Sequence, residues 1–408
     1  MSERDLHLAV ALDGAGWHPA AWREPDARPA QLFTAAYWTW LVAEAERGLL
    51  DFVTFEDSLG LQSTDRDGPD NRTDRVRGRL DAVLTAARVA PLTRNIGLVP
   101  TVIATHTEPF HASKAIATLD YVSAGRAGLR VKVSARRDEA GHFGRRSFPP
   151  VRPGDPGDPA AAGLAGDLLD EAADYVEVIR RLWDSWEDDA EIRDVATGRF
   201  IDRDKLHYIG FTGRWFAVKG PSITPRPPQG QPVVTALGHG SAPYRLIARA
   251  ADVGYVTPRD AAQAGEIVAE IRAAQAAAGR AAQTVHVFGD LLVFLDGTAA
   301  GAAARKARLD EAAGGDDPGD AMAFTGTPGE LADLLQDWHR AGLSGFRLRP
   351  AAIPHDLSLI TRGLVPELQR RDAFRHAYQA GTLRGLLGLS RPANRYAPAG
   401  GRHDQHAG

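Results

Sequence analysis

Short apolar runs recur along the chain, and segments with helical periodicity separate them. Eight runs have the length and composition of buried strands: Leu6–Leu12, Phe52–Phe55, Ile96–Ala104, Leu129–Ser134, Pro232–Leu237, Asp252–Thr257, Val285–Leu295 and Gly345–Leu348. A regular alternation of strand and helix predicts a parallel sheet whose connections are helices. Eight such units favour a closed (β/α)8 barrel, the TIM barrel of the α/β class, over an open doubly wound sheet.

The connecting segments show apolar stripes of helical period. One stripe in the second connection consists of Leu80, Val83, Leu84 and Ala87, and a longer one in the fourth consists of Leu168, Ala172, Tyr175, Val176, Ile179, Leu182 and Trp183. We expect both stripes to face the core. Before the last strand, Thr327, Pro328 and Glu330 predict a helix that begins with a capping box. The first strand ends in "ALDGAGW", whose glycines do not have the spacing of a dinucleotide-binding turn.

Three stretches interrupt the regular plan. Residues 135–166 are rich in Pro, Gly and Asp, which predicts a mobile flap after the fourth strand without helix or strand. Residues 191–230 are an insertion before the fifth strand, in which "HYIGFTGRWFAVKG" predicts a hairpin. Residues 389–408 are polar and predict a flexible C-terminal tail. The remainder, 1–388, is expected to form a single barrel domain.

Composition narrows the class of protein. The chain has 408 residues, 44% hydrophobic and 25% charged, with a formal net charge of −4, so neither nucleic acid nor a membrane surface is an expected partner. No apolar run approaches the roughly 18–20 residues that cross a bilayer, and the N-terminus has no signal-peptide pattern, so a cytoplasmic location is expected. The chain has no cysteine, which excludes disulfides and thiolate chemistry. Demanding redox chemistry therefore needs a bound cofactor.

The fourth strand carries an unusual pattern of charge. Arg130, Lys132 and Ser134 alternate with apolar residues, which places them on the lumen side of a barrel strand. Unpaired cations there are costly, so they either pair with carboxylates at the rim, for which Glu56 and Asp57 are candidates, or meet an anionic ligand. The alternative is a shifted register that leaves both cations on a solvated rim.

Other polar residues follow the ends of the predicted strands. Asp13, Thr105 and His106 follow the first and third strands, and Gly238, His239, Gly240 and Ser241 form a turn after the fifth. A glycine-rich turn before a helix points backbone N–H groups at a bound anion such as a phosphate. The alternative is an ordinary turn in which Ser241 caps the helix. The sequence has no HExxH, GxSxG or P-loop motif, so no metal site and no acyl-enzyme chemistry are predicted.

Several motifs in order carry a resemblance to a known family. They include "GAGWHPAAWRE" (14–24), "FVTFEDS" (52–58), "RLDAVLTAARVAPLTRNIGL" (79–98), "ATLDYVSAGRAG" (117–128), "VEVIRRLWDSWEDDA" (176–190) and "RWFAVKGPSITPRPPQGQPVV" (214–234). With these the chain resembles the bacterial-luciferase-like flavin-dependent monooxygenases, in the branch of the nitrilotriacetate, dibenzothiophene-sulfone and long-chain alkane monooxygenases. The resemblance implies a homodimer or homotetramer that takes reduced FMN from a separate NAD(P)H:flavin reductase and uses O2 to oxygenate a small organic substrate.

The resemblance also assigns site residues. Arg130, His106 and His142 are the candidates for catalysis, and His142 stands in "HFG" where relatives often have "NFG". The expected FMN-binding residues are Asp57, Thr105, Arg130, Lys132, Ser134, Gly238, His239, Gly240 and Ser241. Relatives commonly read "GRAGWNVVTS" where this chain has "GRAGLRVKVS", and they have paired serines where it has His239 and Gly240. The charged fourth strand is therefore where this chain departs most from the family pattern.

Two other functions stay open at this point. A deazaflavin-dependent oxidoreductase uses the same barrel, and Arg130 and Lys132 suit its more anionic cofactor. The second alternative is a catalytically silent protein that binds flavin or has an accessory role, since the strand and the turn are altered. The substrate is not predicted, because its contacts come from the variable loops 60–78 and 135–166.

Overall fold

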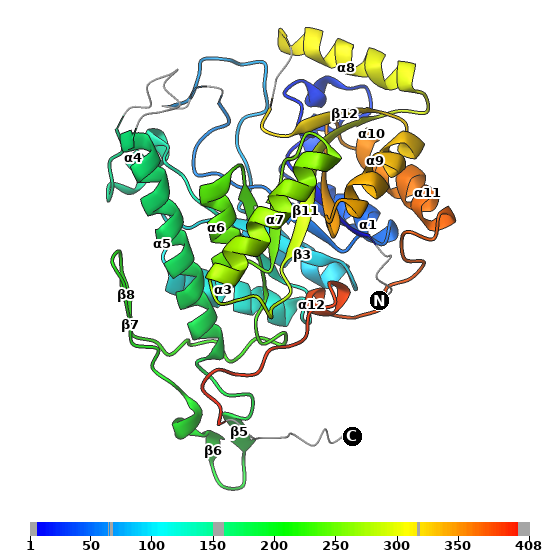
Figure 1. The fold of residues 1–408 in the computed structure, drawn as a ribbon. Helices are drawn as coiled ribbons and strands as arrows, with labels where there is room; N and C mark the ends of the chain where they lie inside the picture. Colours follow the sequence, from blue (N-terminus) through cyan, green and yellow to red (C-terminus); the bar gives the residue numbers. More distant parts are fainter. Residues whose placement is uncertain (1–5, 64, 66–67, 150–158, 316–318, 399–408) are drawn as a thin grey trace.

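The computed structural model describes the chain except residues 1–5, 64, 66–67, 150–158, 316–318 and 399–408 (Figure 1). Eight parallel strands form its centre: β1 (His7–Leu12), β2 (Phe52–Phe55), β3 (Gly97–Ile103), β4 (Gly128–Lys132), β9 (Val233–Gly238), β10 (Val253–Val256), β11 (His286–Leu295) and β13 (Gly345–Pro350). They pair in this order, and pairing of β13 with β1 closes the ring. The predicted TIM barrel is confirmed.

All eight predicted strands are present, and the barrel sheet has a ninth strand that was not predicted. Strand β12 (Met322–Gly326) pairs with Leu291–Leu295, the outer half of β11. Strand β10 pairs only with the inner half of β11, at His286–Gly289, so β12 occupies the edge that β10 leaves. The five residues of β12 are mostly half-exposed and show no clear apolar run, which is why the sequence pattern did not mark them.

Helices surround the barrel (Figure 1). Those between strands are α1 (Ala35–Arg47), α2 (Ala82–Val89), α3 (Pro109–Val122), α5 (Pro159–Asp184), α6 (Ser241–Ala250), α7 (Ala261–Ala277), α8 (Ala299–Ala313) and α9 (Pro328–Arg340). After β13 come α10 (His355–Leu359), a π-helical turn (Ile360–Leu364), α11 (Val365–Arg370) and α12 (Leu383–Leu386). The predicted capping box at the start of α9 is confirmed, with Thr327 and Glu330 bonding reciprocally.

The two predicted apolar stripes have different outcomes. All seven stripe residues of α5 are buried, from Leu168 to Trp183. The stripe on α2 is wrong for Leu80 and Leu84, which are 36% and 70% exposed. Its other two members, Val83 and Ala87, pack partly buried against the core, beside the buried Ala82, Ala86 and Val89. Asp81 caps this helix by accepting a hydrogen bond from the Leu84 N–H. The inward face of α2 thus consists of alanines and valines, and Leu84 faces outward.

The two predicted irregular regions contain more regular structure than composition indicated. Within 135–166, residues Arg137–Phe143 form α4, and α5 begins at Pro159, so the expectation that no helix forms there is wrong for these parts; residues 150–158 lie outside the described part of the chain. In the insertion, β7 (Phe211–Thr212) and β8 (Ala217–Val218) form the predicted hairpin. A second hairpin, β5 (Glu191–Asp194) with β6 (Arg199–Ile201), was not predicted.

The C-terminal segment closes the end of the barrel at which the strands begin. Leu383 and Leu387 pack with Phe52, Val99 and Phe288, which fill the lumen floor. The contacts continue beyond 389: Arg391 pairs with Asp188, and the buried Asn394 amide donates to the Asp184 and Trp186 carbonyls. Residues 389–398 thus differ from the expected flexible tail, and 399–408 lie outside the described residues. In the described part of the chain, none of the helices has the length and apolarity to traverse a bilayer.

Candidate active site at the barrel mouth

The cations of β4 are buried and belong to a network of ion pairs. Leu129 and Val131 pack in the apolar core, which leaves Arg130 on the lumen side as the alternation predicted. Arg130 is 4% exposed, and its Nη1 donates to Glu56 Oε2 and to the Thr101 hydroxyl. The predicted pairing with Glu56 is confirmed, and the alternative of a solvated rim is wrong for Arg130.

The network continues through the last strand. Arg347 on β13 donates to Glu56 Oε1 at 3.2 Å and forms a fork with Asp290 on β11, at 2.9 and 2.8 Å. Arg349 donates from Nε to the same Asp290 carboxylate at 2.9 Å and also pairs with Asp320. Asp290 and Arg347 are direct neighbours in the register of β11 and β13. Together with Arg130, six side chains are thereby joined in one network.

Electrostatics hold these groups in their charged forms. Burial alone would raise the pKa of Glu56, but Arg130 and Arg347 outweigh burial and lower the pKa to about 2. Burial likewise opposes ionisation of Asp290, and Arg347 and Arg349 lower its pKa to about 2. Such pairs avoid the cost of an isolated buried charge because each carboxylate has a guanidinium in direct contact.

Lys132 differs from the other lumen cations. Its Nζ donates to the Asp57 backbone carbonyl at 3.0 Å, and within the described part of the chain no carboxylate oxygen lies within 4.0 Å of it. The predicted pairing with the Asp57 carboxylate is wrong, because that group accepts the N–H groups of Ser58 and Ala82 at 2.7 and 3.0 Å. Burial lowers the pKa of Lys132. Among the described residues of this network, the four cations Arg130, Lys132, Arg347 and Arg349 face the two buried carboxylates Glu56 and Asp290 and the half-exposed Asp320 at the rim.

The turn after β9 leads into α6 without a side-chain cap. Gly240 is the N-cap residue with φ of +132°, and Ser241 is the first helical residue, so the interpretation of Ser241 as the cap is wrong. Both ring nitrogens of His239 are bonded, Nε2 to Asp320 at 3.1 Å and Nδ1 to the Thr257 hydroxyl at 2.9 Å. Asp320 therefore joins this turn to Arg349 and so to the lumen network.

The ends of β3 and β4 are tied together by two predicted residues. Thr105 and Ser134 are both buried, and the Ser134 N–H donates to the Thr105 hydroxyl at 2.9 Å. His106 is also buried, and burial lowers its pKa. Its Nε2 is enclosed and has no hydrogen-bond partner among the described residues, and its ring stacks on Phe143 with centroids 5.1 Å apart.

Helix α4 covers this part of the mouth. Its buried Glu139 accepts hydrogen bonds from the Ser58 hydroxyl at 2.7 Å and from the Leu59 N–H, which attaches the helix to the segment after β2. His142 lies in the last turn of α4 with an exposed side chain. The structure thus brings His106 under α4 but leaves His142 on its outer surface, away from the lumen network.

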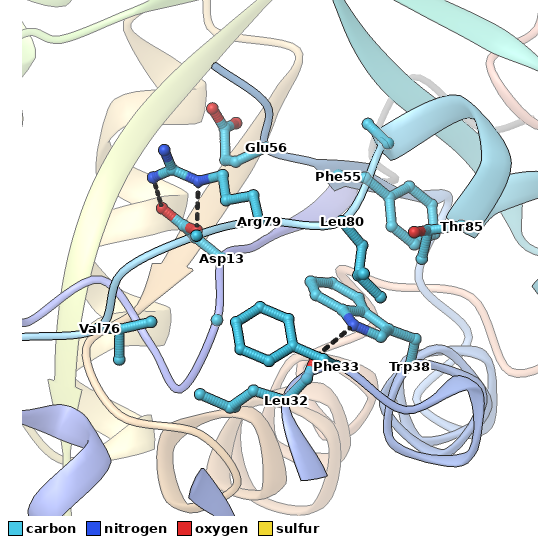
Figure 2. A pocket seen from close by; sticks show the side chains of 13 residues that line it. Asp13, Leu32, Phe33, Trp38, Phe55, Glu56, Val76, Arg79, Leu80 and Thr85 are labelled. Atoms are coloured by element: carbon cyan, nitrogen blue, oxygen red, sulfur yellow. Dashed lines mark hydrogen bonds and ion pairs between the residues drawn. The ribbon is translucent and has the colours of Figure 1, made fainter. Parts of the chain in front are cut away.

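A further ion pair separates two cavities at the mouth. Arg79 forms a fork with Asp13, at 3.0 and 2.6 Å, and Figure 2 shows this pair beside Glu56. The cavity in Figure 2 has apolar walls that include Phe33, Trp38 and Phe55. Asp13 and Arg79 also line a second cavity, whose other lining residues come from 14–22 and from 62, 63, 75 and 76.

Four of the six residues of the lumen network were not identified from the sequence: Asp290, Asp320, Arg347 and Arg349. Arg347 and Arg349 stand in "GFRLRP", which has the same alternation of cation and apolar residue as "GLRVKV". Asp290 is the one charged residue of the apolar run Val285–Leu295. Both the alternation in "GFRLRP" and the single charged residue in the apolar run can be seen in the sequence. Among the described residues, no three His, Asp or Glu side chains gather in a way that could hold a metal ion.

Comparisons with known proteins agree with this architecture. The family model described as luciferase-like monooxygenase matches residues 16–345. N-acetyl-S-(2-succino)cysteine monooxygenase of Bacillus subtilis (strain 168) is 29% identical over 97% of this chain and 99% of that protein. Nitrilotriacetate monooxygenase component A of Aminobacter aminovorans is 28% identical over the same shares. A riboflavin lyase, solved with modified FMN and riboflavin, superposes with a TM-score of 0.82 at 25% identity, covering 96% of this chain and 97% of its own.

Proposed function

The chain belongs to the luciferase-like monooxygenase family, and we propose that it is a two-component FMN-dependent monooxygenase. In this proposal a separate NAD(P)H:flavin reductase supplies reduced FMN, and the enzyme uses O2 to oxygenate a small organic substrate. Relatives that match nearly their whole length are named as monooxygenases, and a structural neighbour holds a modified FMN. The proposal also includes a homodimer or homotetramer, which sedimentation velocity of the purified protein would test.

The observation that supports FMN as the ligand is Lys132, the cation at the mouth that has no carboxylate partner among the described residues. Lys132 is a half-buried ammonium group whose one bond is to a backbone carbonyl, while the other lumen cations have carboxylate partners. Burying an ammonium group without a counter-ion costs several kcal/mol in the free protein. An anionic ring bound above Lys132 would provide that counter-ion, which supports reduced flavin as the ligand.

The turn at the start of α6 fits the phosphate of FMN. The first N–H groups of a helix lack intrahelical partners, and no side chain caps them here. Pro243 has no N–H, so Ser241 and Ala242 are the donors of this turn. A side chain at Gly240 would find open space but would be strained at φ of +132°, which favours glycine and leaves the approach to these donors clear. We propose that the residues 238–241 hold the phosphate.

Each part of the site then has a proposed role. Bound reduced FMN supplies the chemistry that activates O2. Arg130 and Lys132 balance negative charge in the lumen, and the Thr105–Ser134 bond fixes the strand ends against the ligand. Helix α4, attached through Glu139, excludes water from this side. Asp57, whose carboxylate is bonded to two backbone N–H groups, holds the segment that faces Lys132.

His106 is the better placed of the two histidines for proton transfer. Its lowered pKa keeps the imidazole neutral near pH 7, and no described residue forms a hydrogen bond with its Nε2. We propose that the imidazole of His106 accepts or returns a proton at the substrate, and that His142 has a smaller effect because it is exposed. His106→Ala should lower turnover, whereas His111→Ala, an exposed histidine on α3, should not.

The direct test compares cofactors. Under anaerobic conditions the protein is titrated with reduced FMN and, separately, with a reduced deazaflavin, and O2 uptake is then measured for each complex. We expect tight binding of reduced FMN and O2 uptake from that complex. Binding of the deazaflavin alone would favour the alternative oxidoreductase, for which the cationic lumen is the supporting observation. Binding of FMN without any substrate conversion would favour the silent accessory protein.

A further inference from the structure

The second cavity at the mouth is lined by a guanidinium, that of Arg75, which has no ion-pair partner among the described residues. This cavity has a volume of about 400 Å³, which is within the range of small-molecule sites. It lies between the loop after β1 and residues 62, 63, 75, 76 and 79, and Trp17, Trp22, Gln62 and Arg75 are among its lining residues.

Arg75 differs from the neighbouring arginines 72, 77 and 79. Arg72 pairs with Asp74, Arg77 with Asp70, and Arg79 with Asp13. The half-buried Arg75 has no ion pair and no hydrogen bond to any described residue, and its Nε is enclosed by protein atoms. A guanidinium withdrawn from water without a partner is costly, because each buried N–H donor loses a hydrogen bond to water.

The remaining charges around the cavity neutralise one another. The Asp13 carboxylate is occupied by the fork with Arg79. His18 Nδ1 accepts the Ala20 N–H at 3.1 Å, so its Nε2 carries the proton that is donated to Asp310 at 3.1 Å. His18 is therefore neutral in this arrangement, and the lining has one uncompensated positive charge, at Arg75.

The aromatic wall of the cavity is fixed in place. Backbone bonds join Trp17 N to the Pro350 carbonyl at 3.0 Å, and the Trp17 indole N–H donates to the Ala11 carbonyl at 2.9 Å. The Arg349 guanidinium lies 4.5 Å from the centre of the Trp17 ring. The Trp22 indole N–H donates to the Asp74 carbonyl at 3.1 Å. The wall thus connects directly to the lumen network and presents a rigid apolar surface beside Arg75.

We infer that this cavity binds an organic anion, with its carboxylate or sulfonate group on Arg75 and its planar or apolar body against Trp17 and Trp22. A guanidinium with free N–H donors forms strong charge-assisted hydrogen bonds with such groups, and an indole face suits a flat apolar body. The identification of this anion as the substrate to be oxygenated rests on the proposed function. The binding of the anion itself does not.

The test is a calorimetric titration of the whole protein, without flavin, with 2-naphthoate and with its neutral analogue 2-naphthamide. We expect 2-naphthoate to bind more tightly than the amide. Arg75→Gln should weaken 2-naphthoate binding by about tenfold or more and leave the amide unchanged, because only the charged ligand uses the guanidinium. Arg75→Lys should restore part of the affinity. Arg72→Gln is the matched control, since Arg72 lies in the same segment but does not line the cavity, and should change neither affinity.

Three results would overturn the inference: no saturable binding of 2-naphthoate, equal affinity for acid and amide, or the same loss for both ligands in Arg75→Gln. Because the titration needs neither flavin nor O2, it is independent of the proposed function. Binding of 2-naphthoate through Arg75 in a protein that does not bind reduced FMN would refute the monooxygenase proposal and leave the anion site standing.

Discussion

Replacing Glu56 with glutamine tests whether the lumen network stabilises the fold. The Glu56 carboxylate is 6% exposed and accepts from both Arg130 and Arg347. Within the described residues it is the one carboxylate that pairs with Arg130. Glu56→Gln keeps the shape of the side chain but removes its charge, which leaves four lumen cations facing two carboxylates.

Two estimates of the cost agree. The pKa of Glu56 is lowered from 4.5 to about 2, and at about 1.4 kcal/mol per pKa unit this difference corresponds to about 3 kcal/mol of stability at neutral pH. Removal of one partner from a buried ion pair in other proteins costs about 3–5 kcal/mol. We therefore expect Glu56→Gln to lower the free energy of unfolding by about 3 kcal/mol.

Urea unfolding followed by circular dichroism would measure this loss. The matched control is Glu108→Gln, because Glu108 and its partner Arg145 are 61% and 65% exposed, and its effect should lie within about 0.5 kcal/mol. A second variant, Glu56→Gln with Arg130→Gln, should recover part of the loss by removing an unpaired cation. If Glu56→Gln costs no more than the control, the lumen charges are solvated and the reasoning is refuted.

Three further predictions concern stability. Because the folded-state pKa values of Glu56 and Asp290 are lowered to about 2, their stabilisation is complete above about pH 5 and is lost as pH falls; acid titration should therefore destabilise the wild type more than Glu56→Gln. Leu84→Ala should change the free energy of unfolding by less than about 0.5 kcal/mol, whereas Val89→Ala should cost about 1–2 kcal/mol in the same urea assay. Thr327→Ala should lower it by about 1 kcal/mol, and Thr327→Ser should retain most of the stability; an equal loss in both would contradict the capping role.

The barrel was predictable because buried parallel strands are nearly continuous apolar runs with helices between them. The strand β12 was not predicted because it is short and half-exposed. The predicted inward face of α2 was wrong in part, because Ala82, Ala86 and Val89 rather than Leu84 are the buried residues of this helix. Helix α4 formed in a segment whose overall composition predicted none. Helix α4 is attached to the barrel by the hydrogen bond from Ser58 to Glu139, which joins residues 81 positions apart in the sequence.

The candidate site was predictable in part for a similar reason. Alternation placed Arg130 in the lumen, and proximity of strand ends identified Glu56 as its partner. The links from Arg347 to Asp290 and from Arg349 to Asp320 depend on the register of β13 against β11 and on a loop that follows α8. The periodicity of one strand does not determine its register against another strand. The full set of residues in the network therefore could not be predicted from the sequence.

The most direct test of the central claim is an anaerobic titration of the protein with reduced FMN, for the wild type and for Lys132→Val. The substitution places an apolar residue where relatives commonly have one and removes the cation that lacks a carboxylate partner. We predict saturable binding to the wild type, weakened by about tenfold or more in Lys132→Val, with a smaller change for oxidised FMN. Failure of reduced FMN to bind the wild type, or equal binding to both proteins, would contradict the account.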